Sequence, residues 1–235
     1  MSAIFITGTD TGVGKTLVGC GLAAALTAHG KTVGVLKPAE TGCPIQDGRL
    51  YPEDAMRLAA FAQTRLPVDA ICPYRFAPPV APSVAAEQAG VTIELETILS
   101  TFRQIAAHHD ITIVEGAGGL LVPLNGQYTF AELAHDLGIP TLVVVGSKLG
   151  AINHALLTFR YARTLSLPLL GYILNHPSPT TDLAIQTNAQ TLARLTDVPC
   201  RGRIPFLSLS GDIKQDRRAL GDLFARAVDL TGVLG

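Results

Sequence analysis

A glycine-rich segment near the start of the chain constrains the fold most strongly. Gly8-Thr-Asp-Thr-Gly-Val-Gly-Lys15-Thr16 follows the apolar run Ile4-Phe5-Ile6 and precedes a long helical pattern, which predicts a strand, a tight turn and a helix. In such a turn several backbone N–H groups converge on phosphate oxygens, and the helix N-terminus adds partial positive charge. Lys15 can then reach the β and γ phosphates, and the Thr16 hydroxyl can bind Mg²⁺. The segment therefore predicts a binding site for a nucleoside triphosphate.

The segment departs from the strict Walker pattern at one position. That pattern places a glycine five residues before the glycine of Gly-Lys-Thr, where this chain has Thr9, and Gly8 lies one residue further back. A glycine-rich turn with a solvated lysine is the simpler alternative. The strand before the segment and the helix after it favour phosphate binding.

Composition excludes several classes of protein. The chain has 235 residues, 48% of them hydrophobic, which is enough to bury a large core in one domain spanning residues 1–235. The formal net charge is −1 and no basic patch is concentrated in the sequence, so a general nucleic-acid binder is not expected. A small anionic ligand in a local pocket fits these features better.

No segment predicts export or membrane insertion. The N-terminus lacks a basic segment ahead of its apolar run, and no stretch approaches the roughly 18 to 20 apolar residues that span a membrane. Four widely spaced cysteines, Cys20, Cys43, Cys72 and Cys200, include no C-x-x-C pair and have no histidines at zinc-finger intervals. They are expected to be reduced thiols of a cytoplasmic protein.

Short apolar runs alternate with helical segments along the chain. The runs at 111–114, 141–145 and 169–174 lack in-and-out alternation, which is typical of parallel strands buried on both faces. Helical spacing occurs at about 15–29, 53–63, 94–108, 129–137, 151–166, 181–195 and 216–232. Loops are expected at 72–82 and 207–216. The pattern predicts an α/β domain with a parallel sheet, helices on both faces and ligands beyond the C-terminal ends of the strands.

Charged side chains follow two of the expected strands. Lys37 comes directly after the strand at 32–36, where a lysine can also be a solvated terminus that the core does not need. Glu115 comes directly after 111–114, as in a Walker B type metal site, and the glycines up to Gly119 either admit a ligand or form a simple tight turn. From spacing alone, Asp54 is better interpreted as a helix cap or dipole partner than as a site residue.

Amide groups lie at two further strand ends. Asn175 follows the strand at 169–174, where its side chain can offer a donor and an acceptor to a base edge or can form a turn. Residues 146–154 open a helix after a strand, so the exposed N–H groups there can hold a carboxylate. Asn153 can equally be a capping residue of that helix.

Taken together, these motifs closely resemble dethiobiotin synthetase. The resemblance runs from residue 4 to about 207 and rests on four segments and one asparagine: Gly-Thr-Asp-Thr-x-Val-Gly-Lys-Thr at 8–16, Lys37-Pro38, Val-Glu-Gly-Ala-Gly-Gly at 114–119, Lys-Leu-Gly-x-Ile-Asn-His at 148–154, and Asn175. It implies a fold of the P-loop NTPase type. It also implies an ATP- and Mg²⁺-dependent ring closure in biotin synthesis, in which 7,8-diaminopelargonate and CO₂ become dethiobiotin with release of ADP and phosphate.

The resemblance assigns roles to residues of this sequence. Lys15, Lys37 and Thr11 would be catalytic, and Thr16, Asp54 and Glu115 would surround Mg²⁺. The nucleotide would contact Gly12, Val13, Gly14, Lys15, Thr16, Leu17, Glu115, Gly116, Gly118, Asn175 and the backbone near Pro205. The diamine, its carbamate and its carboxylate would contact Thr11, Thr41, Leu149, Gly150, Ala151 and Asn153. Asn175 would recognise adenine.

The resemblance also implies a route and an assembly. In the implied route, a carbamate on one amine attacks the γ-phosphoryl group and gives a carbamic-phosphoric anhydride, and the second amine then closes the ring. In the implied assembly, a homodimer, the helix that opens at 149–153 of one subunit completes the active site of its neighbour. Some relatives have an acidic residue where this chain has Gly12, and the missing carboxylate predicts looser nucleotide selectivity.

Two other classes share the expected architecture. A partition or cell-division ATPase of the deviant Walker A type would have a signature lysine five residues before Lys15, where this chain has Asp10. A corrin-amidating synthetase would add a glutaminase domain, for which the chain ends too early. A nucleotide-sensing module is a further alternative, and its ATP hydrolysis would not respond to the diamine.

Overall fold

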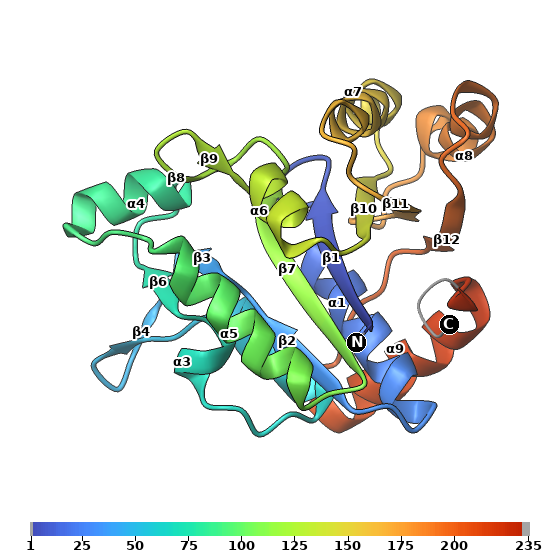
Figure 1. Cartoon of the computed structure of the whole chain (residues 1–235). Coiled ribbons are helices and arrows are strands. Elements are labelled where there is room, and N and C mark those ends of the chain that lie inside the picture. The colour runs from blue at the N-terminus through green and yellow to red at the C-terminus, as the bar shows by residue number, and fades with distance from the viewer. Residues whose placement is uncertain (1, 232–235) are drawn as a thin grey trace.

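The structure, a computed structural model, describes residues 2–231 and is built around one parallel sheet (Figure 1). Within these residues the strand order is β12-β11-β10-β1-β7-β2, and every neighbouring pair runs parallel. The strands are β1 (Ser2–Gly8), β2 (Val33–Leu36), β7 (Ile111–Gly119), β10 (Thr141–Gly146), β11 (Leu169–Asn175) and β12 (Cys200–Ile204). Short two-stranded pieces lie beside this sheet: β3 (Ala39–Thr41) with β6 (Tyr74–Phe76), β4 (Ile45–Gln46) with β5 (Arg49–Leu50), and β8 (Pro123–Asn125) with β9 (Tyr128–Thr129).

Helices cover both faces of the sheet, because its strands are apolar on both sides. Ile4 and Ile6 of β1 pack in a core with α1 (Lys15–Ala28), α2 (Glu53–Ala62) and α9 (Ile213–Ala227). Ala3 and Phe5 face the opposite core, with α4 (Pro82–Ala89), α5 (Leu95–Ala107) and α6 (Phe130–Leu137). On that second face α7 (Ala151–Thr164) and α8 (Leu183–Leu195) pack over β10 and β11. The predicted α/β fold is confirmed.

The strand predictions were correct for the centre of the sheet and incomplete at its edge. The edge strand β12 was not predicted, because Cys-Arg-Gly-Arg-Ile has a glycine and two arginines where an apolar run was sought. The strand β7 continues through Gly119, so Glu115 lies inside a strand and the tight-turn interpretation of the following glycines was wrong. The register between β1 and β7 shifts at this point and pairs Gly8 with Gly119.

Each predicted helix is present with small changes in its bounds, and two short helices were missed. The missed helices are α3 (Val68–Ile71) and α4. The loop expected at 72–82 contains the strand β6. The loop expected at 207–216 ends earlier, because the Asp212 side chain accepts a hydrogen bond from the Gln215 N–H at 2.9 Å and starts α9 at Ile213. The helix expected to reach 232 ends at Ala227, where the backbone becomes extended, and residue 232 itself lies outside the described residues.

The contact between α1 and α9 closes the core on one face of the sheet. Gly21 of α1 faces Phe224 of α9 so closely that a β-carbon on Gly21 would lie 2.2 Å from the phenylalanine ring. On the other side of the same contact, a β-carbon on Gly221 would lie 3.4 Å from Ala24, an ordinary contact distance. Only the first glycine is therefore required by packing.

In the described part of the chain, none of the helices combines the length and the hydropathy needed to cross a bilayer.

Alanine at these two glycines is expected to have opposite effects on stability. Gly21→Ala should lower the free energy of unfolding by about 1 to 3 kcal/mol, because the Phe224 ring and α9 must move. Gly221→Ala, the matched control, should be neutral or raise it by up to about 1 kcal/mol through helix propensity. Urea unfolding followed by circular dichroism measures both. A Gly21→Ala variant as stable as the parent protein would show that the two helices do not pack as described.

Candidate active site

A cavity of about 570 Å³ opens at the C-terminal ends of the central strands, where the predicted site residues were expected. Its wall includes Pro79, Val80 and Ala81 of the segment that precedes α4 and Pro82 at the start of α4, together with Glu40, Ala117 and Val122. The predicted residues that line it are Thr11, Gly12, Gly14, Lys15, Thr16, Lys37, Thr41, Asp54 and Gly118. The two lysines, 22 positions apart in the sequence, therefore face one cavity.

The glycine-rich loop has the backbone of a phosphate cradle. Gly14 is the N-cap of α1 with φ of 92°, and Gly12 has φ of 74°, both in the left-handed region that favours glycine. Lys15 is only 8% exposed, and its Nζ lies 3.4 Å from the Asp10 carbonyl oxygen. Burial, followed by the charge of Lys37, lowers the pKa of Lys15 to about 8. An anion in the cavity would relieve both effects, because it would pair with the buried ammonium group.

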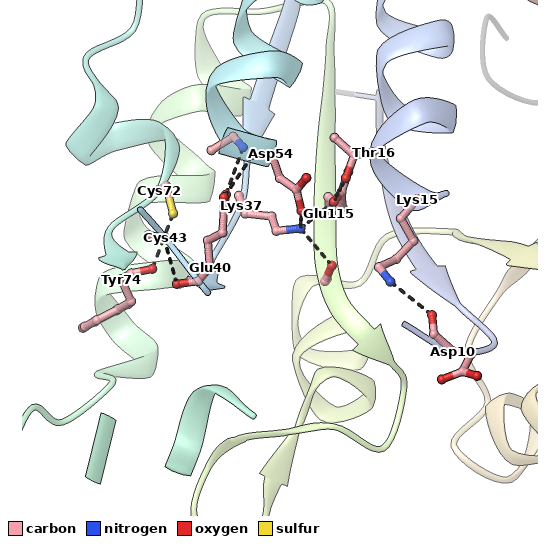
Figure 2. A network of polar contacts seen from close by, with 12 residues as sticks. Asp10, Lys15, Thr16, Lys37, Glu40, Cys43, Asp54, Cys72, Tyr74 and Glu115 are labelled. Atoms are coloured by element: carbon pink, nitrogen blue, oxygen red, sulfur yellow. Dashed lines mark hydrogen bonds and ion pairs between the residues drawn. The ribbon is translucent and has the colours of Figure 1, made fainter. Parts of the chain in front are cut away.

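Lys37 is the centre of a buried ion cluster (Figure 2). Its Nζ lies 2.5 Å from Glu115 Oε1 and 3.1 Å from Asp54 Oδ2, and the residue is 2% exposed. Burial alone would lower the pKa of Lys37, but the charges of Glu115 and Asp54 outweigh it and raise the pKa above its ordinary value. The interpretation of Lys37 as a solvated strand terminus was therefore wrong, and the expectation that the core does not need it is replaced below by a prediction of lost stability.

Asp54 belongs to this cluster, and its interpretation as an ordinary helix cap was wrong. The N-cap of α2 is Pro52, and the Asp54 side chain pairs with Lys37. Burial alone would raise the pKa of Asp54, but the Lys37 charge and hydrogen bonds from Lys37 and Thr16 hold it below its ordinary value. Spacing along the sequence could not show this, because the partner directly follows β2 and lies 17 positions away in the sequence.

The donor set around Glu115 fits a magnesium ion. The Thr16 hydroxyl donates to Glu115 Oε1 at 2.9 Å, and Glu115 Oε2 is buried without a hydrogen-bond partner among residues 2–231. Those residues contain no group of three or more His, Cys, Asp or Glu side chains placed to hold a metal. Mg²⁺ bound with substrate phosphates needs only one or two carboxylates, since phosphate oxygens and water complete its octahedron. A hydroxyl and two carboxylates with an unpaired oxygen meet that requirement.

The charge balance of the cavity also favours a cation. Lys15, Lys37, Glu40 and Asp54 line the cavity, and Glu115 is buried beside Lys37, which gives one net negative charge when all five groups are charged. Opposite charges at short range interact strongly in such a partly buried setting. A divalent cation together with a polyphosphate would bring both signs of charge into the same space.

Asn175 lies beneath the glycine-rich loop and does not form a turn. It is the last residue of β11, and its Nδ2 donates to the Val13 carbonyl oxygen at 2.8 Å. A β-carbon on Gly14 would lie 2.2 Å from that Nδ2, so loop and amide are in close contact. The amide oxygen Oδ1 is buried without a hydrogen-bond partner within residues 2–231. Pro205 follows Ile204 of β12, which is in register with Asn175, so the two predicted base contacts are neighbours.

The segment at 149–153 does not line the cavity of its own chain. Leu149 is 84% exposed, and Gly150 is the N-cap of α7 with φ of 90°. Ala151 is buried, and Asn153 is inside the helix without a capping hydrogen bond, so its capping interpretation was wrong. Leu149, Gly150 and Asn153 are exposed, so this helix start can be reached from outside the chain, although the Ala151 N–H donates to the Lys148 carbonyl oxygen.

The remaining predicted residues support the site from outside the cavity. Val13 and Gly116 are buried, and Leu17 is a partly buried residue that packs against the core containing α1. Sequence reasoning missed Glu40, Ala117, Val122 and the segment 79–82 as parts of the wall. Glu40 could have been found, because it lies between Lys37 and Thr41 in a segment that was already singled out.

Comparisons with known proteins are consistent with this geometry. A family described as "AAA domain" matches residues 2–214. The chain is 42% identical to the ATP-dependent dethiobiotin synthetase BioD of Anaeromyxobacter dehalogenans strain 2CP-C, over 97% of this chain and 99% of that protein. It is 36% identical to the protein of that name from Thermodesulfovibrio yellowstonii, over 98% and 97% of the two chains.

The chain belongs to the dethiobiotin synthetase family. This relation over nearly the whole length separates it from the partition ATPases that share its architecture. A ParA family ATPase from Chlorobium tepidum superposes with a TM-score of 0.56, covering 95% of this chain and 91% of that one, but only 14% of the residues are identical. The septum site-determining protein MinD from Pyrococcus horikoshii, solved with Mg-ADP, gives a TM-score of 0.53 at 17% identity, over 87% and 81% of the chains. These two similarities show the P-loop fold alone.

Replacing Lys37 is expected to destabilise the fold. Lys37→Met should lower the free energy of unfolding by about 3 kcal/mol at neutral pH, because it leaves the fully buried Glu115 carboxylate without its positive partner. The pKa of Lys37 is raised, so its contribution is present at low and neutral pH and is lost only as the pH rises above its ordinary value of 10.5. The pKa of Asp54 is lowered, so its contribution is lost only as the pH falls below its ordinary value of 3.8.

The loss should therefore be present in full near pH 7, below the pKa of about 8 that burial and the charge of Lys37 give Lys15, and urea unfolding at that pH would measure it. The exposed Lys31, replaced by Met, is the control and should change stability by less than about 0.5 kcal/mol. Equal stability of the Lys37→Met and Lys31→Met proteins would mean that the ion cluster does not hold the structure together.

Proposed function

We propose that this protein catalyses the ATP-dependent closure of 7,8-diaminopelargonate with CO₂ to dethiobiotin, releasing ADP and phosphate. Membership of the dethiobiotin synthetase family supports the reaction. The observation that carries the proposal for this chain is the meeting of Lys15 and Lys37 in one cavity with Thr16 and Asp54, next to the buried Glu115 that contacts Lys37 and Thr16. Two ammonium groups and a set of oxygen ligands are what transfer of a γ-phosphoryl group requires.

The first step joins CO₂ to one amine. The nitrogen lone pair forms a C–N bond, a proton leaves the nitrogen, and a carbamate results. In our proposal this carbamate lies near Thr11 and Thr41, whose hydroxyl groups can donate hydrogen bonds and which both line the cavity. A carbamate is an anion, so the ammonium groups of Lys15 and Lys37, together with a bound cation that offsets the nearby carboxylates, would hold it close to the terminal phosphate.

The second step transfers the phosphoryl group. A carbamate oxygen attacks the γ-phosphorus, the bond from that phosphorus to the bridging oxygen of ADP breaks, and a carbamic-phosphoric anhydride forms. Lys15 and Lys37 would neutralise charge on the γ-phosphoryl oxygens, and the backbone N–H groups that open α1 would hold the β-phosphate. Mg²⁺ held by Thr16, Asp54 and Glu115 would supply further charge neutralisation when bound.

The third step closes the ring. The second amine attacks the carbonyl carbon of the anhydride, the C–O bond to phosphate breaks, and the nitrogen loses a proton. No step needs a covalent bond to the protein, so the residues act by positioning and by electrostatics. Asn175 Oδ1 would accept a hydrogen bond from the adenine amino group, with the backbone near Pro205 as a second contact.

We further infer that the protein is a cytoplasmic homodimer and that residues 1–235 act as one synthetase domain. The carboxylate of the diamine needs a partner, since an unpaired buried charge is costly. The N–H groups at Leu149 to Asn153 can provide one, but they do not line the cavity of their own chain. A second copy of the chain would bring them to it. The exposed Leu149 is consistent with such a contact.

Purified protein with ATP, Mg²⁺, bicarbonate and 7,8-diaminopelargonate should form dethiobiotin, detected by mass spectrometry. Lys37→Met should lower turnover at least about 100-fold, because one positive group on the transferred phosphoryl is lost, and Lys31→Met should leave it unchanged. ATP hydrolysis at the same rate with and without the diamine would favour a nucleotide-sensing module instead.

The same assay with CTP in place of ATP tests whether the nucleotide selectivity is loose, as expected from Gly12. A strong preference for ATP would contradict that expectation.

The affinity for ADP, whose β-phosphate Lys15 is expected to pair with, should fall as the pH rises. The pKa of Lys15 is lowered to about 8 in the ligand-free protein, so above this pH the ammonium must regain a proton before it can pair with phosphate. The dissociation constant should then increase by up to about tenfold per pH unit. Lys15→Arg keeps its charge throughout this range and should flatten the profile. Calorimetric titration of ADP between pH 7 and 9.5 measures this, and a flat profile for the parent protein would contradict it.

A further inference from the structure

Glu40 is a buried carboxylate on the wall of the cavity to which the proposed chemistry gives no role. It is the middle residue of β3, it is 6% exposed, and it lies three residues after Lys37. Both of its oxygens are engaged. Oε1 accepts a hydrogen bond from the Asp54 N–H at 2.9 Å, and Oε2 accepts one from the Ala55 N–H at 3.0 Å.

These two bonds replace a helix cap. The first N–H groups of a helix have no partner within the helix and are normally bound by the N-cap side chain. In α2 the N-cap is Pro52, whose side chain has no acceptor, and the first helical hydrogen bond is from the Met56 N–H to the Pro52 carbonyl oxygen. Glu40 therefore caps α2 from outside the helix, with a negative charge that also suits the helix dipole.

The capped residue is the one whose side chain faces the ion cluster. Asp54 receives a hydrogen bond on its carboxylate from Lys37 and donates its own N–H to Glu40. Its side chain is 44% exposed, against 3% for that of Lys37, so surrounding packing does not fix its direction. The backbone of Asp54 must therefore be held in place if its carboxylate is to stay at 3.1 Å from Lys37 Nζ.

We propose that Glu40 is a positioning residue: its carboxylate fixes the first turn of α2 so that the Asp54 carboxylate faces Thr16 and Lys37 and can serve as an oxygen ligand of the divalent cation. Burial raises the pKa of Glu40, whereas the charge of Lys37 and the two N–H bonds favour its charged form. Figure 2 shows Glu40 on the side of Asp54 and Lys37 that faces away from Thr16, and its two oxygens are occupied by backbone donors. It thus acts through Asp54 and does not need to touch the cation.

The test compares Glu40→Gln with a capping glutamate elsewhere. The amide that replaces the Glu40 carboxylate offers one acceptor oxygen and turns an N–H₂ group toward the second backbone donor, so one of the two bonds is lost. Glu132 caps α6 by accepting a hydrogen bond from the Thr129 N–H at 2.8 Å, and α6 contributes no residue to the cavity wall. Glu132→Gln is therefore the matched control, since it makes the same chemical change at a helix start remote from Asp54.

Binding of Mn²⁺ in the presence of ADP is measured from the electron paramagnetic resonance signal of free Mn²⁺, together with thermal melting of each variant. Glu40→Gln should weaken Mn²⁺ binding by about tenfold or more, as is usual for groups that orient a metal ligand. Glu132→Gln should bind Mn²⁺ within about twofold of the parent protein even where its melting temperature falls, because it does not touch the ligand set. If Glu40→Gln does not fold, Glu40→Asp keeps the charge but is one methylene too short for both bonds, and the same loss is expected.

Unchanged Mn²⁺ affinity in a folded Glu40 variant with a lowered melting temperature would overturn the proposal, because Glu40 would then be a structural cap alone. An equal loss in Glu132→Gln would also overturn it. The inference rests on the proposed function only in assuming that the cavity takes a divalent cation with a nucleotide. If the parent protein itself does not bind Mn²⁺ with ADP, the proposed function is contradicted. If the parent protein binds Mn²⁺ and the Glu40 variants bind it equally well, only the proposal for Glu40 is contradicted.

Discussion

The buried ion cluster of Lys37, Glu115 and Asp54 is the interaction on which the rest of the site depends. A carboxylate in the middle of a buried strand is unfavourable unless a positive group meets it, and Lys37 provides that group at 2.5 Å. The cluster joins a strand end, an adjacent strand and a helix start, so it fixes the relative positions of three chain segments. Two of these charged groups, Lys37 and Asp54, also line the cavity in which we propose that phosphate and metal bind.

The glycine-rich loop completes this arrangement from the other side. Gly14 must be a glycine both for its left-handed backbone and because the Asn175 amide lies where a side chain would begin. Through that amide the loop is tied to the end of β11, where the base of a nucleotide is expected. In the proposed nucleotide complex, phosphate and base contacts would thus be coupled through one buried asparagine. A change at position 14 or 175 would then disturb both of these contacts together.

Much of this could be predicted from the sequence, because the strongest signals are local. The strand, turn and helix at residues 2–28 follow from apolar runs and glycines that lie side by side in the chain. Asp54 could not be assigned correctly from spacing, since its role depends on Lys37 and Glu40, which reach it through tertiary structure. The strand β12 was missed because it is an edge strand with two arginines and lacks the apolar run of a central strand.

The most direct measurement is the position of a bound cation. A crystal grown with Mn²⁺ and a non-hydrolysable ATP analogue would locate the metal by its anomalous scattering. The peak is predicted at coordination distance from Thr16, with Asp54 and Glu115 as its other protein neighbours directly or through water, and with Lys15 and Lys37 both facing the terminal phosphate. A peak away from these three residues, or a terminal phosphate contacted by only one of the two lysines, would contradict a single shared centre for phosphoryl transfer.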